Sequence, residues 1–355
     1  MTENWPSRFP ERSSEFSATG GNALSLLDPQ ETSPPNQLKP TYREQFLAGN
    51  EKEYEATQEA YNMIWTNPSA SHIYNLNNCR RHAYFARDKV SGDVKIMTDS
   101  CRERWCPMCA GQKSKYAKES TQRWIETLDS PRFLTLTLKH CQENLLSQVE
   151  FLQDAFRRLR YRAYWKKRVT GGIWFLQVHR SENDGCWHPH FHILLDGVYL
   201  EHDKLSALWD LVTFGSPIID IRRVNDPEES ASYVARYSAR PAKLAEMSID
   251  DRVEMILALK GKRLSGTFGT AKTVTLTPPK ISDGSEWQQI GYYDQIVSDA
   301  NTNEAAKTIL NAYLNDEPIT EKEYFAYTGI EVNPQKRLAK IKEVAQYNLE
   351  FYNTF

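Results

Sequence analysis

The segment HPHFHILL at residues 188–195 constrains the fold more than any other part of this sequence. Its histidine and apolar residues alternate, and successive side chains of a β-strand point to opposite faces. His188, His190 and His192 therefore share one face, while Phe191 and Ile193 point to the other, toward a core. Two imidazoles two residues apart on a strand can bind one divalent metal ion side by side. A pair of surface histidines on an edge strand is the simpler alternative.

The neighbouring sequence predicts the rest of an α+β domain. The sequence predicts strands at residues 133–138, which alternate, and at 173–179 and 217–224. The segment 188–195 would form a hairpin with 173–179. Helical spacing of apolar residues predicts helices at 143–168, 201–213 and 228–240. This order of elements favours a mostly antiparallel sheet covered on one face by helices.

Four regions follow from the patterning along the chain. Residues 1–40 contain many prolines and little apolar periodicity, so we expect a disordered arm. Residues 41–125 should form a helix that ends at Asn67-Pro68 and then a loop-rich cysteine segment. Residues 126–248 should form the α+β domain, and residues 249–355 an accessory, mainly helical C-terminal region.

Charge is unevenly distributed. The net charge is only −2, so the chain as a whole is not a basic nucleic-acid binder. The stretch 151–170 is nevertheless rich in Lys and Arg, whereas residues 279–355 are acidic overall, which predicts a localised anionic partner. A solvated helix face is the alternative for the basic stretch. Its candidate phosphate contacts are Arg157, Arg158, Arg160, Arg162, Lys166, Lys167 and Arg168. No apolar run approaches a membrane span and no signal pattern is present, so we expect a cytoplasmic protein without a membrane partner.

In that compartment the six cysteines are more typical of metal ligands or free thiols than of disulfides. Cys101, Cys106 and Cys109 form a CxxxxCPxC pattern, and Cys79 supplies a fourth thiol upstream. Four thiolates satisfy tetrahedral zinc and leave no open position, so this pattern predicts a structural Zn²⁺ site. His82 is an alternative to Cys79, and a redox CxxC is disfavoured because the thioredoxin-like context is absent.

The histidine site needs at least one further ligand. Gln177 and His179 lie two residues apart in the partner strand, and a hairpin would place one of them beside His190 and His192. Two histidines and one neutral ligand leave positions open for a phosphate oxygen. Because Mg²⁺ prefers oxygen donors and Mn²⁺ accepts imidazole more readily, we expect Mn²⁺ or Mg²⁺, with zinc as an alternative.

A downstream helix carries two tyrosines. Tyr233 and Tyr237 are spaced i, i+4 and so share a helix face, and Arg236 and Arg240 form a neighbouring row that could hold phosphates. Ordinary aromatic packing is the structural reading of such a pair. The functional reading is a tyrosine nucleophile, which attacks a phosphodiester to form a phosphotyrosine and free a 3′-hydroxyl.

These motifs, in this order, resemble those of the HUH endonucleases, specifically the rolling-circle replication initiator (Rep) proteins of bacterial plasmids and phages. FLTLT at 133–137, HPHFHILL at 188–195 and YVARYSAR at 233–240 are similar to the three family motifs, and the cysteine pattern is similar to the zinc-binding segment of plasmid Rep proteins. The resemblance implies a ferredoxin-like sheet, with His190 and His192 as metal ligands and Tyr237 as the nucleophile. The third metal ligand in many relatives is a Glu, and the resemblance places Gln177 at the matching position.

A second departure concerns Tyr233. One plasmid branch has a Glu at this position that activates water to end replication, whereas the YxxxY form resembles the two-tyrosine initiators of some phages and related transposases. We therefore expect Tyr233 and Tyr237 to alternate as nucleophiles, or Tyr233 to carry out the terminating strand transfer.

The expected function is a replication initiator that nicks one DNA strand at an origin and stays attached to the 5′ end. Its partner would be origin DNA, single-stranded or extruded as a hairpin. No Walker motif is present, so a host helicase would act in trans, and homo-oligomerisation is possible. The alternatives are an HUH-type transposase and a non-catalytic, zinc-containing DNA-binding protein.

Overall fold

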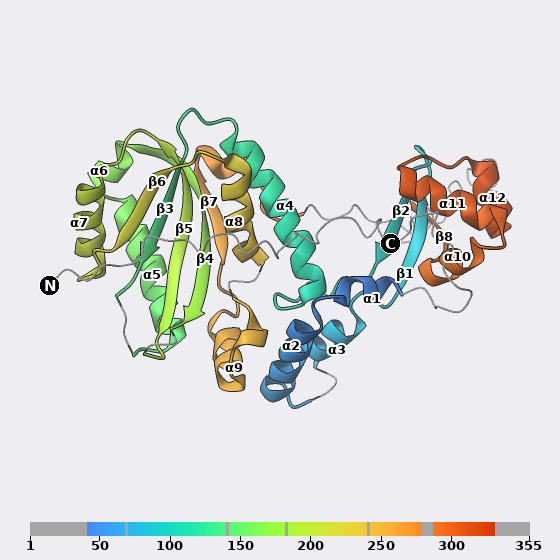
Figure 1. The fold of residues 1–355 in the computed structure, drawn as a ribbon, viewed down its shortest axis with the longest axis horizontal. Coiled ribbons are helices and arrows are strands. Elements are labelled where there is room, and N and C mark those ends of the chain that lie inside the picture. Colours follow the sequence, from blue (N-terminus) through green and yellow to red (C-terminus); the bar gives the residue numbers. More distant parts are fainter. Residues whose placement is uncertain are drawn as a thin grey trace, which may run out of the picture. The chain divides into compact units, whose positions relative to one another are not determined.

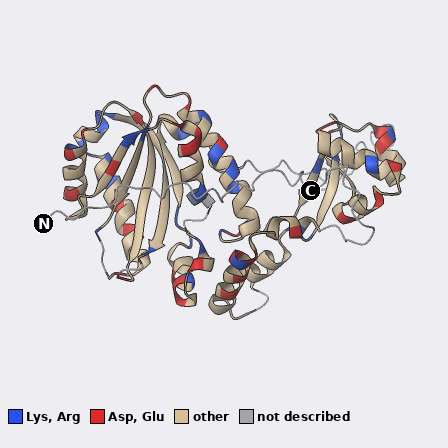
Figure 2. Ribbon diagram, viewed as in Figure 1, with Lys and Arg blue, Asp and Glu red and all other residues tan. Residues whose placement is uncertain are grey.

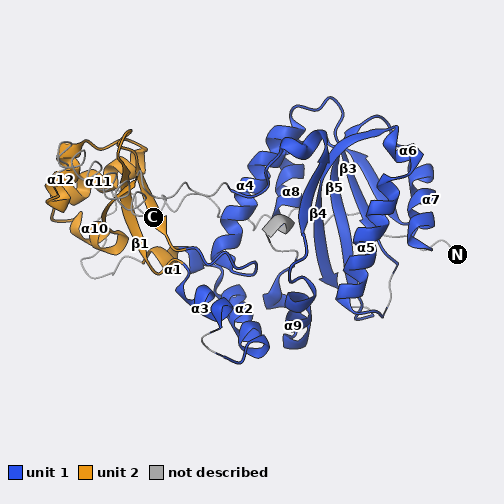
Figure 3. Cartoon of the chain, turned by 180° about the vertical axis from the view of Figure 1, so that it is seen from behind, with its two compact units in different colours: residues 1–31, 46–79, 100–280 blue, residues 32–45, 80–99, 281–355 orange. Residues whose placement is uncertain are grey.

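The computed structural model describes residues 41–67, 70–139, 142–181, 184–239, 242–278 and 287–330 (Figure 1). The chain divides into two compact units (Figure 3). Unit 1 comprises residues 1–31, 46–79 and 100–280, and unit 2 comprises residues 32–45, 80–99 and 281–355. The arm predicted at residues 1–40 and the end of the predicted C-terminal region, 331–355, lie outside the described residues.

Unit 1 contains a five-stranded sheet in which every pair of neighbouring strands is antiparallel. The strand order is β6 (Ile219–Arg223), β3 (Arg132–Thr137), β5 (Trp187–Gly197), β4 (Val169–Arg180) and β7 (Ser265–Gly269). The central strand, β5, is the one that carries the alternating histidines. The predicted α+β class with an antiparallel sheet is therefore confirmed.

One face of this sheet packs against α5 (Leu145–Arg160) and α7 (His202–Thr213), with α6 (Ala163–Lys166) between them in the chain (Figure 1). The packing follows from strand alternation, because Phe191, Ile193 and Leu195 of β5 all point to this side and are buried. The rings of Phe156 in α5 and Phe191 lie 5.4 Å apart. The apolar stripe predicted in the first helix is thus buried in this core.

The opposite face is covered by α8 (Pro227–Ala239) and α4 (Pro107–Ile125). The sequence indicated helices on one face of the sheet only. In the structure, helices cover both faces. The reason is that Phe133, Phe175 and Leu194 form an apolar patch on this face, and Val234 of α8 and Ile125 of α4 bury it. This is the face to which His190 and His192 also belong.

Three further helices pack around the start of α4: α2 (Glu51–Ile64), α3 (Ser71–Asn78) and α9 (Ile249–Ala258). A buried carboxylate, that of Glu53 in α2, accepts hydrogen bonds from the backbone N–H groups of Leu244 (2.9 Å) and Ala245 (3.1 Å). These bonds tie α2 to the short 3₁₀ helix Leu244–Glu246 that precedes α9.

Unit 2 contains a three-stranded antiparallel sheet in the order β2 (Val94–Thr98), β1 (Ala83–Asp88) and β8 (Trp287–Tyr292). Its helices are α1 (Tyr42–Leu47, whose last residues belong to unit 1), α10 (Tyr293–Asp299), α11 (Glu304–Asn315) and α12 (Glu321–Thr328). Phe85 stacks on Tyr293 with ring centroids 5.6 Å apart and meets Tyr313 edge-on at 5.5 Å. The strands of this sheet were not predicted from the sequence.

Within the described ranges, the helices lack the combination of length and apolar character that crossing a lipid bilayer requires.

Candidate functional site

The histidine face is built from three adjacent strands in register. Thr135 of β3 pairs with His192, Thr137 pairs with His190, and Gln177 of β4 pairs with His190 from the other side. Directly paired residues point to the same side of a sheet. The sheet therefore brings the side chains of His190, His192 and Gln177 together on the face that α8 covers.

The two imidazoles converge on a single oxygen. Gln177 Oε1 lies 2.8 Å from His190 Nε2 and 2.6 Å from His192 Nε2. His190 Nδ1 lies 3.2 Å from the carbonyl oxygen of His188, an acceptor to which only an Nδ1–H can donate, and His192 Nδ1 lies 3.3 Å from Thr135 Oγ1. With His190 protonated on Nδ1, its Nε2 presents a lone pair toward the Gln177 amide.

A divalent cation could accept that lone pair. Two imidazole nitrogens and one amide oxygen form a donor set that suits a divalent metal ion, and the Nδ1–H···O=C contact is the usual outer support of a metal-binding histidine. The residues present therefore fit a divalent cation. His179, the alternative third ligand, pairs with His188, stacks on it at 4.9 Å and meets the His190 ring at 5.5 Å between centroids.

Burial keeps both imidazoles neutral. It lowers the pKa of His190 to about 4, and positive charge on His179 acts in the same direction. The pKa of His192 is also well below its ordinary value, first because of burial and then because of electrostatic interaction with His190, Arg222 and Arg236. Near pH 7 both rings are thus neutral, with one ring nitrogen free to bind a metal.

The tyrosine helix, α8, lies over this face. The Tyr233 ring contacts His192 at 5.1 Å and Phe133 at 5.8 Å between centroids. Ala231 and Val234 are buried against the sheet and fix the rotation of the helix. Tyr237 follows in α8 one helical turn after Tyr233, about 6 Å along the axis. The Tyr237 side chain and all of Arg240 lie outside the described residues.

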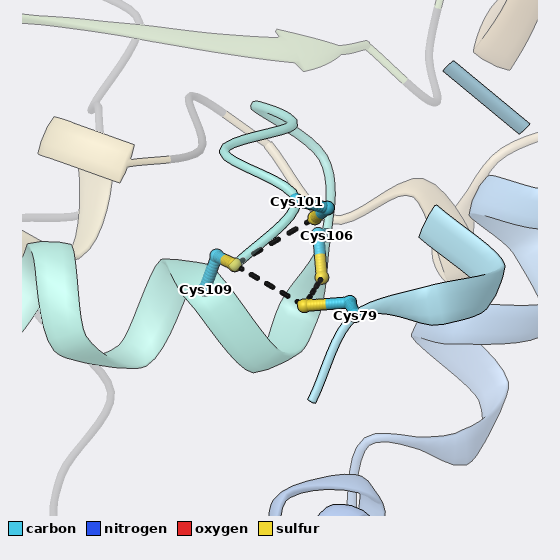
Figure 4. Close-up of side chains that lie close together, drawn as sticks. All are labelled: Cys79, Cys101, Cys106 and Cys109. Atoms are coloured by element: carbon cyan, nitrogen blue, oxygen red, sulfur yellow. Dashed lines mark hydrogen bonds between the residues drawn. The ribbon is translucent and has the colours of Figure 1, made fainter. Parts of the chain in front are cut away.

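The four predicted cysteines form a second cluster (Figure 4). Cys79 and Cys109 have their sulfurs 3.5 Å apart, Cys101 and Cys109 3.6 Å, and Cys106 and Cys79 3.7 Å. These distances approach the edge of a tetrahedron with metal–sulfur bonds of about 2.3 Å, which is about 3.8 Å, and are far from a disulfide bond. The clustering of the four thiols is confirmed, and they could bind a metal ion.

Local structure sets the positions of these thiols. Cys79 caps the C-terminus of α3, Cys106 precedes α4, and Cys109 lies in the first turn of α4 after Pro107. Hydrogen bonds from the other thiols, first that of Cys101, and from Ser100, whose Oγ lies 3.3 Å from its sulfur, lower the pKa of Cys109. Among the described residues, the group of potential ligands does not include His82.

The predicted basic segment lies on the other side of the sheet from the histidines, because α5 packs against the Phe191 face. Lys and Arg are interspersed with Asp and Glu on the helices of unit 1 (Figure 2). Several of the basic side chains contact protein groups: Arg157 and Arg158 bind Asp154, Arg160 lies over Phe156, Lys166 over Tyr161 and Arg168 over Tyr164. Arg162 is the N-cap residue of α6, and Lys167 is its C-cap residue. Of the predicted phosphate contacts whose side chains are described, Arg236 is the one near His192.

Three residues near these sites were missed by the sequence analysis. Thr135 was visible as the middle residue of the alternating FLTLT strand, and Arg222 as a basic residue of the predicted strand 217–224. Ser100 directly precedes Cys101, and apart from this position nothing in the sequence marks it as part of the cysteine site.

Comparison with known proteins assigns a family to this chain. The Rep_1 family model, described as a replication protein, matches residues 94–324. A protein named Protein rep from Bacillus amyloliquefaciens is 27% identical over 239 residues, which cover 56% of this chain and 70% of the relative. Proteins of the same name from a Bacillus species (27%) and from Streptococcus pneumoniae serotype 2 (28%) match over 197 residues, 49% of this chain and 62% of each relative. No solved structure matches. This chain therefore belongs to the Rep_1 replication protein family.

Proposed function

We propose that this protein is a rolling-circle replication initiator that nicks and rejoins one strand of origin DNA. The observation that carries the proposal is the convergence of His190 Nε2 and His192 Nε2 on Gln177 Oε1, on the sheet face covered by the tyrosine helix. Membership of a replication protein family agrees with this activity, and relatives named Protein rep point the same way.

In the proposed reaction His190, His192 and Gln177 would hold Mn²⁺ or Mg²⁺. A divalent cation supplies Lewis-acid polarisation of the scissile phosphate, which a weak phenol nucleophile requires. Tyr237 Oη attacks phosphorus and loses its proton to solvent, the P–O3′ bond breaks, and the leaving 3′ oxygen takes up a proton. The products are a 5′-phosphotyrosine and a free 3′-hydroxyl that can prime synthesis. Rejoining is the reverse of these steps.

Tyr233 would perform the second strand transfer of the same cycle. It lies one helical turn before Tyr237, and its ring contacts a proposed metal ligand, His192. The four cysteines would bind a structural Zn²⁺, since four thiolates leave no position open for a substrate. The contacts of the basic α5 segment with DNA, a host helicase in trans and homo-oligomerisation stay predictions.

The test is covalent adduct formation. Purified protein would be incubated with single-stranded segments of its own replicon and Mn²⁺, and SDS-resistant protein–DNA adducts would be mapped by peptide. We expect an adduct on Tyr237 that EDTA and Tyr237→Phe both prevent, with a share on Tyr233. Tyr161→Phe is the matched control, because Tyr161 is 68% exposed and follows α5 on the other side of the sheet.

An adduct that survives Tyr237→Phe and Tyr233→Phe together would disprove the tyrosine mechanism. DNA binding without any adduct, for every segment tested, would favour the non-catalytic DNA-binding alternative. Loss of the terminating transfer alone in Tyr233→Phe would support the two-tyrosine cycle, whereas intact initiation and termination would rule it out.

A further inference from the structure

Two arginines from different elements flank an aromatic cluster beside the histidine site. The rings of Phe133, His192 and Tyr233 contact one another at 5.1–5.8 Å between centroids. The guanidinium carbon of Arg222, in β6, lies 5.1 Å from the Phe133 centroid, and that of Arg236, in α8, lies 5.1 Å from the Tyr233 centroid. Two positive charges are thus held around one cluster of rings that includes His192.

Strand register explains why Arg222 reaches this face. Arg222 pairs with Phe133, which belongs to the core under α8, whereas Arg223 pairs with Arg132 and points to the opposite side of the sheet. Stacking on a ring restricts the guanidinium but leaves the N–H groups along its edge available for hydrogen bonds. The face that carries the histidines therefore has one ordered guanidinium from β6, that of Arg222. Arg223, the next residue, lies on the other face.

One carboxylate beside Arg222, that of Asp220, holds it only weakly. Asp220 Oδ2 lies 3.9 Å from Arg222 Nε, and the two side chains are 57% and 44% exposed. An exposed pair at this distance contributes little, so a ligand with a stronger charge can replace the carboxylate. Arg236 is also exposed, and its guanidinium lies over the Tyr233 ring. Both guanidiniums are accessible and suited to a phosphate, which they bind through paired N–H donors.

We infer that Arg222 and Arg236 form a binding site for a backbone phosphate of single-stranded DNA, next to the histidine site. The inference rests on the proposed function and deepens it, since the bound phosphate would be a neighbour of the scissile one. Arg222 approaches from the sheet and Arg236 from α8, so a strand bound to both lies across the boundary between these elements. The two arginines would set the register of the strand on the site.

The test measures DNA binding without catalysis. Fluorescence anisotropy with a labelled single-stranded oligonucleotide from the replicon, in EDTA, would compare the full-length wild type with Arg222→Gln and Arg236→Gln. We expect each to weaken binding about tenfold, the loss typical of one charged hydrogen-bonding contact. Each should also reduce the dependence of log affinity on log salt by about 0.7. Arg222→Lys should restore the salt dependence but only part of the affinity, because lysine keeps the charge without the paired donors.

Arg223→Gln is the matched control, with the same charge change one residue away on the opposite side of β6. Equal affinities for Arg222→Gln and Arg223→Gln, with circular dichroism unchanged, would overturn the phosphate site. If adducts still form on Tyr237 in that case, the proposed function stands while this inference fails. A wild type that neither binds the oligonucleotide nor forms adducts would overturn both.

Discussion

Acid should destabilise the metal-free protein through the buried histidines. In the folded chain the pKa of His190 is about 4 instead of 6.5, because the residue is buried, with only 7% of its surface exposed. Between these two pH values the unfolded chain binds more protons than the folded one, so the free energy of unfolding falls as pH falls. The contribution of His190 to the free energy of unfolding is complete above about pH 6.5 and is lost progressively as pH falls toward 4.

The size of the effect follows from the same pKa values. Each pH unit of pKa difference corresponds to about 1.4 kcal/mol, so the drop from 6.5 to about 4 in His190 corresponds to about 3 kcal/mol of stability lost by pH 4. The pKa of His192 is lowered as well and acts in the same direction. A loss of this size is a large fraction of the stability of an ordinary domain.

The assay is denaturant unfolding in EDTA at a series of pH values, for wild type and His190→Gln. Glutamine does not titrate, so the variant should lose less stability between pH 6.5 and pH 4 than wild type does. His202→Gln is the control, since that side chain in α7 is 57% exposed, and it should follow the wild-type curve. Parallel curves for wild type and His190→Gln would refute the argument that burial holds this imidazole neutral.

Other predictions concern the cysteine cluster, the support of the histidines and the core. Cys106→Ser should lose zinc, measured by metal analysis, and should be more easily cleaved by protease around α4, whereas Cys186→Ser, which lies outside the cluster, should keep its zinc. Ser100→Ala should weaken zinc binding about tenfold or more in a chelator competition, because it removes the contact to the Cys109 sulfur. Thr135→Val should weaken Mn²⁺ binding by a similar factor in calorimetric titration, and unchanged affinity would show that this hydroxyl does not orient His192. Phe191→Ala should cost about 3–5 kcal/mol in denaturant unfolding.

The histidine face could be predicted from the sequence because strand alternation is local. The choice between Gln177 and His179 could not, since both lie on the same face of the same strand and only the hairpin register separates them. That register pairs Gln177 with His190 and His179 with His188. The cysteine cluster was predictable from spacing and residue type, because thiol ligands leave a pattern in sequence that neutral ligands do not.

Long-range arrangement accounts for most of what was missed. The period of α5 indicated an apolar stripe but not which face of the sheet it would cover, so the sequence could not place the basic segment relative to the histidines. The pairing of β1 with β8 joins strands about 200 residues apart, and no local pattern specifies such a partner. Arg222 likewise acquires its neighbours only when β6 pairs with β3.

The neutral amide of Gln177 has a thermodynamic consequence on the proposed assignment. Two uncharged imidazoles and an amide cancel none of the cation's charge, so the protein alone holds the ion weakly. A DNA phosphate would be the first anion to balance it, and linkage requires that each ligand then strengthen the binding of the other by the same factor. The origin strand would in this way recruit the ion that its own cleavage requires, and a protein without DNA would stay largely metal-free at low metal concentration.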